Sequence, residues 1–240
     1  MRMVGFSTGA LAYGEFEKAL QLLSGTTANA VELSALRQNE LDPLVHALSG
    51  LALGQFGHVS VHLPSSIVPE FENTLLEAVP HLPNEWLLVT HPDVIRTWER
   101  WESLGERLCI ENMDKRKPIG QTASDLRQIF ARLPRASFCL DIGHAHQVDP
   151  TMGEAVLIIE EFRGRLRQLH VSEVNSQSKH DPISLESASA FSLVSHLIPH
   201  DVPAILESRL PSFSVAAVEA EIESARRILD GVGALELAGD

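Results

Sequence analysis

The segment FCLDIGHAHQVDP, residues 138–150, places one acid and two histidines where an apolar run ends. Its first apolar residues are typical of a buried strand. Asp141 closes that run, and His144 and His146 follow within five positions. A carboxylate at the edge of a core is costly unless hydrogen bonds, an ion pair or a metal ion accompany it. The segment therefore raises the question of what pairs with Asp141.

Acids and histidines stand in the same way near the ends of six other apolar runs. Each of them alone is compatible with an ordinary structural role, such as a hydrogen bond to a loop carbonyl or an ion pair with an arginine. Gathered at one rim, however, the carboxylates would raise one another's pKa, and divalent cations would offset their charge. Mixed imidazole and carboxylate ligands suit zinc, manganese, cobalt or iron. The potential ligands at the run ends are Glu32, His62, His91, Glu111, Asp141, His170 and Glu207, and the following loops add His144, His146 and His180.

The elements that must position these residues alternate regularly along the chain. Eight apolar runs read as strands, mostly continuous, as expected for a parallel sheet that is covered on both faces. The predicted strands cover residues 2–8, 29–35, 58–64, 85–91, 107–113, 137–143, 167–173 and 203–209. The predicted helices cover residues 15–23, 41–48, 71–79, 94–104, 123–133, 153–166, 188–198 and 215–230. Eight such pairs in 240 residues predict an α/β fold, a (β/α)8 TIM barrel.

An open doubly wound sheet is the alternative fold, but it needs a glycine-rich phosphate loop after the first strand. STGALAYG, residues 7–14, imitates that loop poorly. No linker rich in Pro, Gly or Ser divides the chain, so we expect a single domain over residues 1–240. In a TIM barrel the active site lies at the carboxyl ends of the strands, where the candidate ligands stand.

Charge and hydropathy narrow the classes of partner. The formal net charge is −13, and the longest basic run is DKRKP at residues 114–118, which makes nucleic acid an unfavourable partner. The chain has neither 18 consecutive apolar residues nor the layout of a signal peptide at its start, so we expect a cytoplasmic protein without a membrane partner. Cys109 and Cys139 lie inside apolar runs, two residues before a candidate ligand, and are expected to be reduced core residues.

Six short motifs carry a resemblance to a known family. In order and in strand position they resemble the metal-site segments of the xylose isomerase-like TIM barrel superfamily, especially its endonuclease IV branch, also called AP endonuclease family 2. The resemblance spans residues 58 to 209, whereas the first two predicted strands carry no diagnostic motif. The motifs are VHLPSSI, THPD, IENMD, CLDIGHAHQVD, LHVSEVN and ILES.

The resemblance implies two metal sites that share one carboxylate. Glu111 would bridge to a second site, completed by His62 and His91, which endonuclease IV adds to the site common to the superfamily. Zinc or manganese is the expected ion, with one or two ions bound. The positions that match the common four-ligand site are Glu111, Asp141, His170 and Glu207.

A third metal site would be incomplete. His144 and His180 match two of its ligands in endonuclease IV, but Ser178 stands where the resemblance requires a carboxylate. Asp181 is adjacent to His180 and would approach with different geometry, so a third tightly bound ion is not expected. His146 has no counterpart and is expected to be a surface or loop histidine.

Two reactions fit these residues. In the first, one metal binds adjacent oxygens of a small sugar or sugar phosphate while Glu111 and Glu207 exchange a proton at carbon, as in an isomerase or epimerase. In the second, two or three zinc ions activate water at a phosphodiester, as in the endonuclease IV branch. The histidines favour the second reaction, whereas the acidic charge and the short loops favour the first, which we place ahead.

A non-catalytic metal-binding barrel, or an enzyme acting on a peptide or an inositol, stays open. The residues expected to contact the substrate are Glu32, Lys115 and Arg209, and Lys117 and Lys179 also lie near the rim in sequence. The oligomeric state is not predicted.

Overall fold

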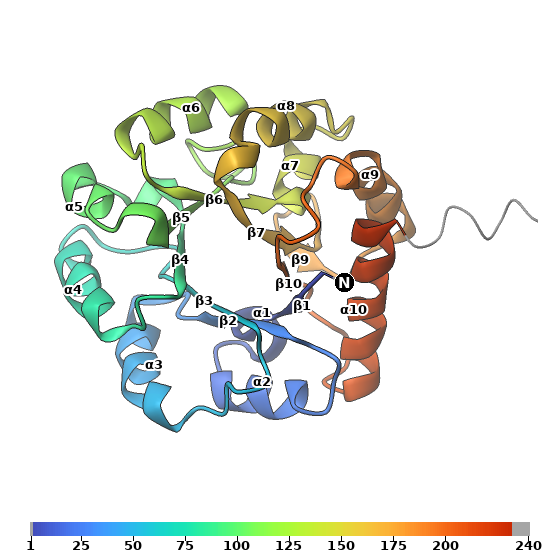
Figure 1. Ribbon diagram of the computed structural model, residues 1–240, viewed down its shortest axis with the longest axis horizontal. Coiled ribbons are helices and arrows are strands. Elements are labelled where there is room, and N and C mark those ends of the chain that lie inside the picture. Colours follow the sequence, from blue (N-terminus) through green and yellow to red (C-terminus); the bar gives the residue numbers. More distant parts are fainter. Residues whose placement is uncertain (1, 232–240) are drawn as a thin grey trace, which may run out of the picture.

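Eight parallel strands close into a barrel in the computed structural model, which describes residues 2–231 (Figure 1). Neighbouring strands follow the order β1-β10-β7-β6-β5-β4-β3-β2, and β2 pairs with β1 to close the ring. Seven of the eight strands fall inside the predicted ranges, and β7 begins one residue before its range, at Leu166, so the TIM barrel prediction is confirmed. The barrel strands are β1 (Val4–Ser7), β2 (Ala30–Ser34), β3 (His58–His62), β4 (Leu87–Thr90), β5 (Leu108–Glu111), β6 (Ser137–Asp141), β7 (Leu166–Val171) and β10 (Ala204–Leu206).

Helices form a ring around the barrel (Figure 1). Every predicted helix overlaps an observed one, but α1 and α7, which follow β1 and β6 directly, were not predicted. The helices are α1 (Thr8–Ala12), α2 (Phe16–Leu23), α3 (Leu41–Ala47), α4 (Phe71–Ala78), α5 (Trp98–Glu102), α6 (Ala123–Arg132), α7 (Ile142–Val148), α8 (Gly153–Phe162), α9 (Leu185–Ser195) and α10 (Val215–Asp230).

Helix α7 corrects the expectation that a loop carries His144. Asp141 caps this helix, because its Oδ1 accepts a hydrogen bond of 2.7 Å from the His144 backbone N–H. Asp and Asn are favoured at such caps, but the sequence reads equally well as a loop. At Gly143 the helix runs so close to the chain just after β7 that a Cβ would lie 2.3 Å from the Ser172 carbonyl oxygen, which excludes any larger residue.

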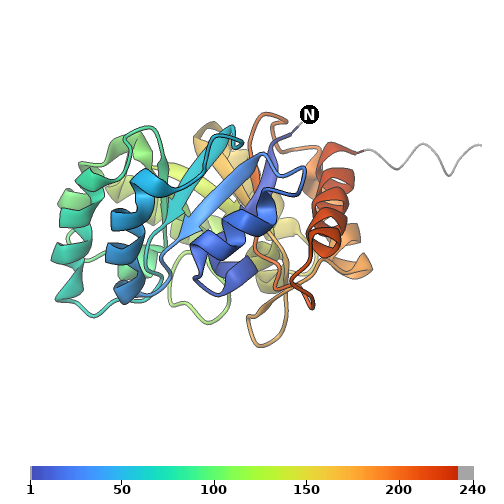
Figure 2. The same ribbon diagram turned by 90° about the horizontal axis from the view of Figure 1, so that it is seen from below.

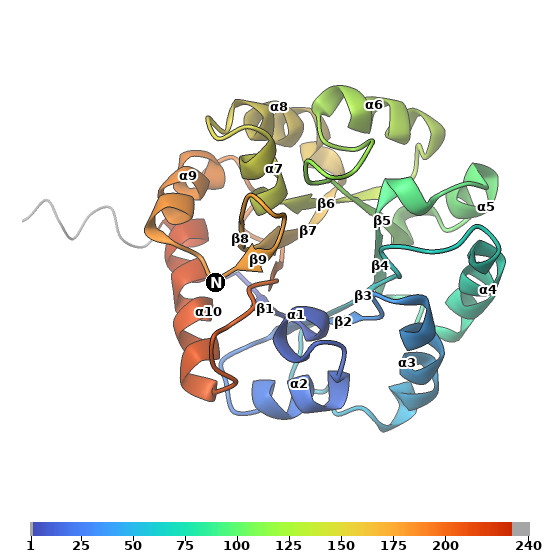
Figure 3. The ribbon, with the colours of Figure 1, turned by 180° about the vertical axis from the view of Figure 1, so that it is seen from behind.

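A short hairpin also escaped prediction. Strands β8 (Glu173–Val174) and β9 (His180–Asp181) pair in antiparallel register beyond the end of β7. The hairpin and the loops that follow the barrel strands lie on the face opposite the start of β1 (Figures 2 and 3). That face is the carboxyl end of the barrel, where TIM barrels carry their active sites.

Strand register decides which predicted residues reach this rim. Asp141 pairs with His170, and Ser34, the last residue of β2, pairs with His62. Glu32 precedes Ser34 by two positions and pairs with Ser60. Since two residues along a strand correspond to one layer of side chains, Glu32 lies one layer below the rim. The expectation from the sequence that Glu32 is a rim residue is therefore wrong.

The apolar core lies between the barrel and its helices, and a small second cluster lies inside the barrel. The second cluster consists of Val89, Cys109 and Cys139, all with no exposed surface. Both cysteines are free and buried, as predicted, and burial raises the pKa of each thiol. Among the described residues, no helix combines the length and the apolar character needed to cross a bilayer.

Candidate metal centre

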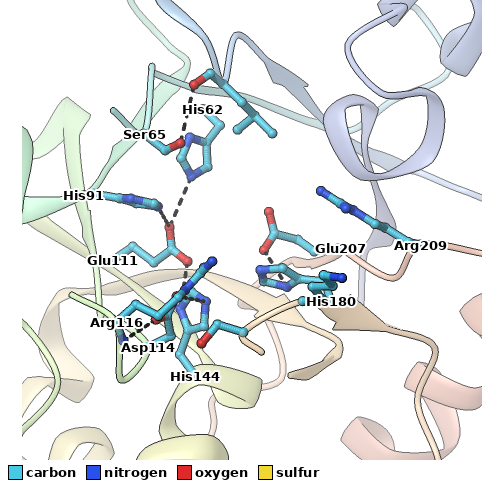
Figure 4. A pocket seen from close by; sticks show the side chains of 13 residues that line it. His62, Ser65, His91, Glu111, Asp114, Arg116, His144, His180, Glu207 and Arg209 are labelled. Carbon is cyan, nitrogen blue, oxygen red and sulfur yellow. Dashed lines mark hydrogen bonds and ion pairs between the residues drawn. The ribbon is translucent and has the colours of Figure 1, made fainter. Parts of the chain in front are cut away.

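A pocket of about 350 Å³ opens at the carboxyl end of the barrel, and its wall is mostly polar (Figure 4). Six of the eight predicted metal ligands line it, and the other two, Asp141 and His170, are fully buried beside them. Its lining residues are Leu36, His62, Ser65, His91, Glu111, Asp114, Arg116, His144, Ser178, Lys179, His180, Glu207 and Arg209.

The Glu111 carboxylate is the centre of the cluster, and its two oxygens face different imidazoles. Oε2 lies 3.2 Å from His62 Nε2 and 3.3 Å from His91 Nε2. Oε1 lies 3.2 Å from His170 Nδ1 and 3.4 Å from His144 Nδ1. A carboxylate with imidazoles on both sides has the arrangement that a bridging ligand between two ions requires.

Beside Glu111, several buried polar atoms have no hydrogen-bond partner among the described residues. They include Asp141 Oδ2, His170 Nδ1 and His91 Nδ1. Buried polar atoms are rarely left unpaired, and an ion is one of the standard explanations. One ligand atom from each of four residues, Glu111, Asp141, His170 and Glu207, falls within 4.8 Å of the others. The chemistry and spacing of these donors therefore fit a divalent cation.

Hydrogen bonds outside the cluster orient two of its histidines. His62 Nδ1 lies 2.7 Å from the Leu63 carbonyl oxygen, to which it donates, and this turns Nε2 toward Glu111 Oε2 at 3.2 Å. His144 Nδ1 donates in the same way to the Asn112 carbonyl oxygen at 2.9 Å, so its Nε2 is the free atom. Contacts of this kind hold the tautomer and the ring plane of metal-binding histidines.

The three carboxylates of the cluster, Glu111, Asp141 and Glu207, have different pKa values. Burial raises the pKa of Asp141 to about 6 and that of Glu207 to about 7, and the neighbouring charge of Glu111 adds to both shifts. Burial alone would raise the pKa of Glu111 too, but His170, His62 and His91 hold it well below its ordinary value. At neutral pH Glu111 is therefore ionised, whereas Glu207 stands close to half protonation.

The pKa values of two histidines, His62 and His180, are also shifted in opposite directions. Burial would lower the pKa of His62, but the hydrogen bond to Glu111 and the charge of Glu32 raise it to about 9. Burial and the charge of His144 lower the pKa of His180 to about 3. His62 therefore has to lose a proton before it can bind a metal ion, and His180 does not.

The third site, which was expected to be incomplete, is only partly assembled. One ligand atom each from Asp141, His144 and His180 falls within 4.8 Å of the others. Ser178 lies buried in the pocket wall, but its hydroxyl is hydrogen-bonded to Gln147, and Asp181 accepts from Asn175 Nδ2 at 2.7 Å. The missing carboxylate is thus supplied by neither residue.

The predicted substrate contacts are only partly found at the pocket. Arg209 lines it, whereas Lys115 is exposed outside the lining and its backbone N–H donates to Gln147. Arg116 lines the pocket in the place that was expected for Lys115, because Asp114 accepts hydrogen bonds of 3.1 and 2.8 Å from the Arg116 guanidinium. Glu32 has no exposed surface, so a direct contact with a substrate does not fit its position.

Sequence reasoning passed over two residues that shape the site. The Asn112 side chain exchanges two 2.8 Å hydrogen bonds with the Asp141 backbone, and this ties the end of β6 to the residue that follows β5. Asp114 is buried in the pocket wall, and the hydrogen bonds from Arg116 lower its pKa to about 2 despite burial. Both lie in the IENMD motif, so their nearness to Glu111 was the available signal. His146 lies outside the pocket and packs edge-on against Phe191.

Comparison with solved structures supports the fold. The IolI protein with a bound zinc atom covers 98% of this chain at 12% identity and a TM-score of 0.58, with all of its own chain aligned. SacUVDE covers 97% at 15% identity and 0.60, with 99% of its own chain aligned. A xylose isomerase-like TIM barrel protein from Mycobacterium smegmatis in complex with magnesium covers 92% at 13% identity and 0.54, with 90% of its own chain aligned.

The chain has the (β/α)8 barrel fold of these proteins. That fold is the one the sequence motifs predicted, and two of the three barrels compared hold a zinc or a magnesium ion. No protein-family model and no curated protein matches the chain. At these identities the likeness concerns the fold, so the chemistry has to be argued from the pocket.

Proposed function

We propose that this barrel is a divalent-metal-dependent isomerase or epimerase of a small sugar or sugar phosphate. The observation that carries the proposal is the pair of glutamates in the pocket wall, Glu111 and Glu207. Both lie at the metal-ligand cluster, and their environments give them different protonation at neutral pH. Pairs of titratable groups held in different states are typical of acid and base catalysts.

The ion would be held by the four-residue group that contains both glutamates, together with Asp141 and His170. A divalent cation there stabilises negative charge that develops on substrate oxygens. Mixed carboxylate and imidazole donors suit zinc or manganese. The acidic cluster is thereby compensated without any lysine or arginine in it.

Proton transfer would fall to the two glutamates. Glu207 lines the pocket at the edge of the ligand group, where its carboxylate can take a proton from a substrate carbon and return it. Glu111 is held ionised by three histidines, so it can accept a proton only as the charge around it changes. We assign Glu207 as the base, and we place Glu111 on the opposite face of the substrate.

The pocket wall suits a small anionic substrate. Its basic residues are Arg116, Lys179 and Arg209, and no carboxylate of the described residues lies within ion-pair distance of Lys179 or Arg209. Such groups bind phosphates and carboxylates. A volume of about 350 Å³ holds a sugar phosphate, and a duplex nucleic acid would also meet the net charge of −13.

A phosphoester hydrolase is the second candidate, and the placement of His62 and His91 favours it. Both rings turn Nε2 toward the same oxygen of Glu111, although a one-metal isomerase needs neither of them. They are suited to hold a second ion next to the first, and paired metal ions are used in phosphoester hydrolysis.

One experiment separates these candidates. The zinc-loaded or manganese-loaded protein is incubated with ketoses, their phosphates and simple phosphodiesters in deuterated, oxygen-18 water. An isomerase introduces deuterium at carbon, and Glu207→Gln should abolish this exchange while Lys115→Ala leaves it unchanged. Oxygen-18 in the product without deuterium would reject the isomerase in favour of the hydrolase, and turnover of no compound in the panel would contradict the proposed substrate class.

A further inference from the structure

A hydrogen-bonded group of side chains fills the barrel directly below the metal centre. Glu32 has no exposed surface, and its Oε2 is the shared acceptor of the group. It lies 2.7 Å from Gln168 Nε2, 3.1 Å from His170 Nε2 and 3.2 Å from Ser60 Oγ. Gln168 Oε1 in turn lies 2.8 Å from His58 Nε2. The group therefore links the lower end of β3 to a predicted metal ligand.

These contacts cross the barrel interior. In the ring of strands, β1 and β10 separate β2, which carries Glu32, from β7, which carries Gln168 and His170. A direct hydrogen bond between β2 and β7 can therefore run only through the inside. A polar group at this depth costs free energy unless its donors and acceptors are hydrogen-bonded, so packing alone does not explain why these polar residues stand here.

The donors and acceptors of the group can be assigned. A carboxylate only accepts, so Ser60 and Gln168 both donate to Glu32. With the amide nitrogen of Gln168 turned to Glu32, its oxygen accepts from His58 Nε2. Among the described residues, no lysine or arginine lies within ion-pair distance of Glu32, and His170 is its only basic neighbour at that range.

His170 has two possible neutral tautomers in this setting. With the proton on Nε2, it donates to Glu32, and Nδ1 presents a lone pair 3.2 Å from Glu111 and 3.6 Å from Glu207. With the proton on Nδ1, the lone pair would face Gln168 Nε2 at 3.0 Å, and the N–H would point into the ligand cluster. Only the first tautomer can bind a metal ion together with the glutamates.

We propose that Glu32 is a positioning residue that holds His170 in the tautomer with the proton on Nε2, so that Nδ1 binds the metal ion. In this role Glu32 lies behind the metal site, whereas the sequence analysis had expected Glu32 to contact the substrate. Carboxylates that accept from metal-binding histidines raise ligand basicity and orient the ring. The inference depends on the metal site of the proposed function and not on its reaction.

The test measures zinc binding and the tautomer without any substrate. Metal-free wild type, Glu32→Gln and Ser60→Ala are titrated with zinc against a competing chelator. We expect Glu32→Gln to weaken zinc binding about 10- to 100-fold, because a neutral amide accepts more weakly and can donate to His170 Nε2 instead. Ser60→Ala keeps the carboxylate and its bond to His170, so a change within about threefold is expected.

Long-range proton–nitrogen NMR of the zinc-loaded wild type should show His170 protonated on Nε2. A folded Glu32→Gln protein with wild-type zinc affinity would overturn the proposal. So would a zinc-loaded wild type with the His170 proton on Nδ1, and this measurement decides the matter even if Glu32→Gln does not fold. A wild type that binds no zinc would overturn the metal site as well, whereas zinc binding without turnover would count against the proposed reaction alone.

Discussion

Glu72 on α4 and Asp141 at the end of β6 are both buried carboxylates, but their oxygens face different neighbours. Glu72 Oε1 accepts hydrogen bonds from the Arg96 backbone N–H at 2.7 Å, the Thr97 backbone N–H at 3.0 Å and the Trp101 indole N–H at 2.9 Å. Burial would raise its pKa, but these donors lower it. Three N–H donors of the protein thus stabilise the charge of Glu72.

Asp141 has one satisfied oxygen and one that faces the ligand cluster. Oδ1 caps α7, whereas Oδ2 has no hydrogen-bond partner among the described residues. Its pKa rises to about 6, chiefly through burial and in part through the charge of Glu111. The comparison shows that this fold can direct three donors to one oxygen of a buried carboxylate, whereas at the metal centre Asp141 Oδ2 accepts no hydrogen bond from the described residues. His144 Nδ1 lies 3.3 Å from Asp141 Oδ2 but does not donate a hydrogen bond to it, so this oxygen is available to a metal ion.

The largest effect should come from removing the open charge of Asp141. We expect Asp141→Asn to lower zinc affinity by more than about 100-fold, since it removes a ligand, and even outer-shell changes cost up to that much. Competition with a chelator measures the loss. His146→Ala is the matched control on the same helix and should bind zinc like the wild type. Equal zinc affinity in Asp141→Asn would remove the distinction between the two carboxylates.

A pH effect should follow from Glu207 in the metal-free protein. Its folded pKa of about 7 lies above the ordinary 4.5, so the stability it contributes is present below pH 4.5 and is lost as pH rises through 7. The full shift corresponds to about 3 kcal/mol. Relative to Glu207→Gln, the wild type should therefore lose stability between these pH values in urea unfolding. Parallel profiles for the two proteins would contradict the raised pKa.

Glu72 should behave in the opposite way. Glu72→Gln removes a charged acceptor from three donors, and we expect it to destabilise the protein by about 2 kcal/mol. Because its pKa is lowered, this stability is present above pH 4.5 and is lost as pH falls.

Metal-free Asp141→Asn should be no less stable than the wild type at neutral pH, since Asn also caps helices. Urea unfolding of both variants with and without zinc checks the contrast, and a stability loss in metal-free Asp141→Asn comparable to that of Glu72→Gln would count against it.

The smallest effect concerns the pocket wall. Arg209 lines the pocket and has no carboxylate partner among the described residues, so Arg209→Ala should raise KM for an anionic substrate about tenfold, or about 1.4 kcal/mol. Lys115→Ala, outside the lining, should leave KM unchanged. The comparison uses whichever phosphorylated compound proves to be a substrate. An unchanged KM in Arg209→Ala would exclude this residue from binding the anion.

The pattern of apolar runs alone predicted the barrel, because each continuous run needs cover on both faces and parallel strands can close into a ring. The eight strands and the burial of Cys109 and Cys139 followed from local pattern. The helices α1 and α7 did not. Each starts directly at a strand end, where Ser7 or Asp141 accepts a hydrogen bond as the cap, and these short segments have too few residues to show a helical period.

The gathering of Glu111, Asp141, His170 and Glu207 at one rim also followed from the sequence, since residues at the ends of parallel strands must meet there. Depth and direction did not, because they depend on register between strands and on contacts across the barrel. Register places Glu32 one layer below the rim and beside His170, and Asp114 turns Arg116 rather than Lys115 into the pocket. The sequence by itself determined that Glu111, Asp141, His170 and Glu207 gather at the carboxyl end of the barrel, and only the tertiary structure decided the depth of each candidate residue and which of its atoms face the pocket.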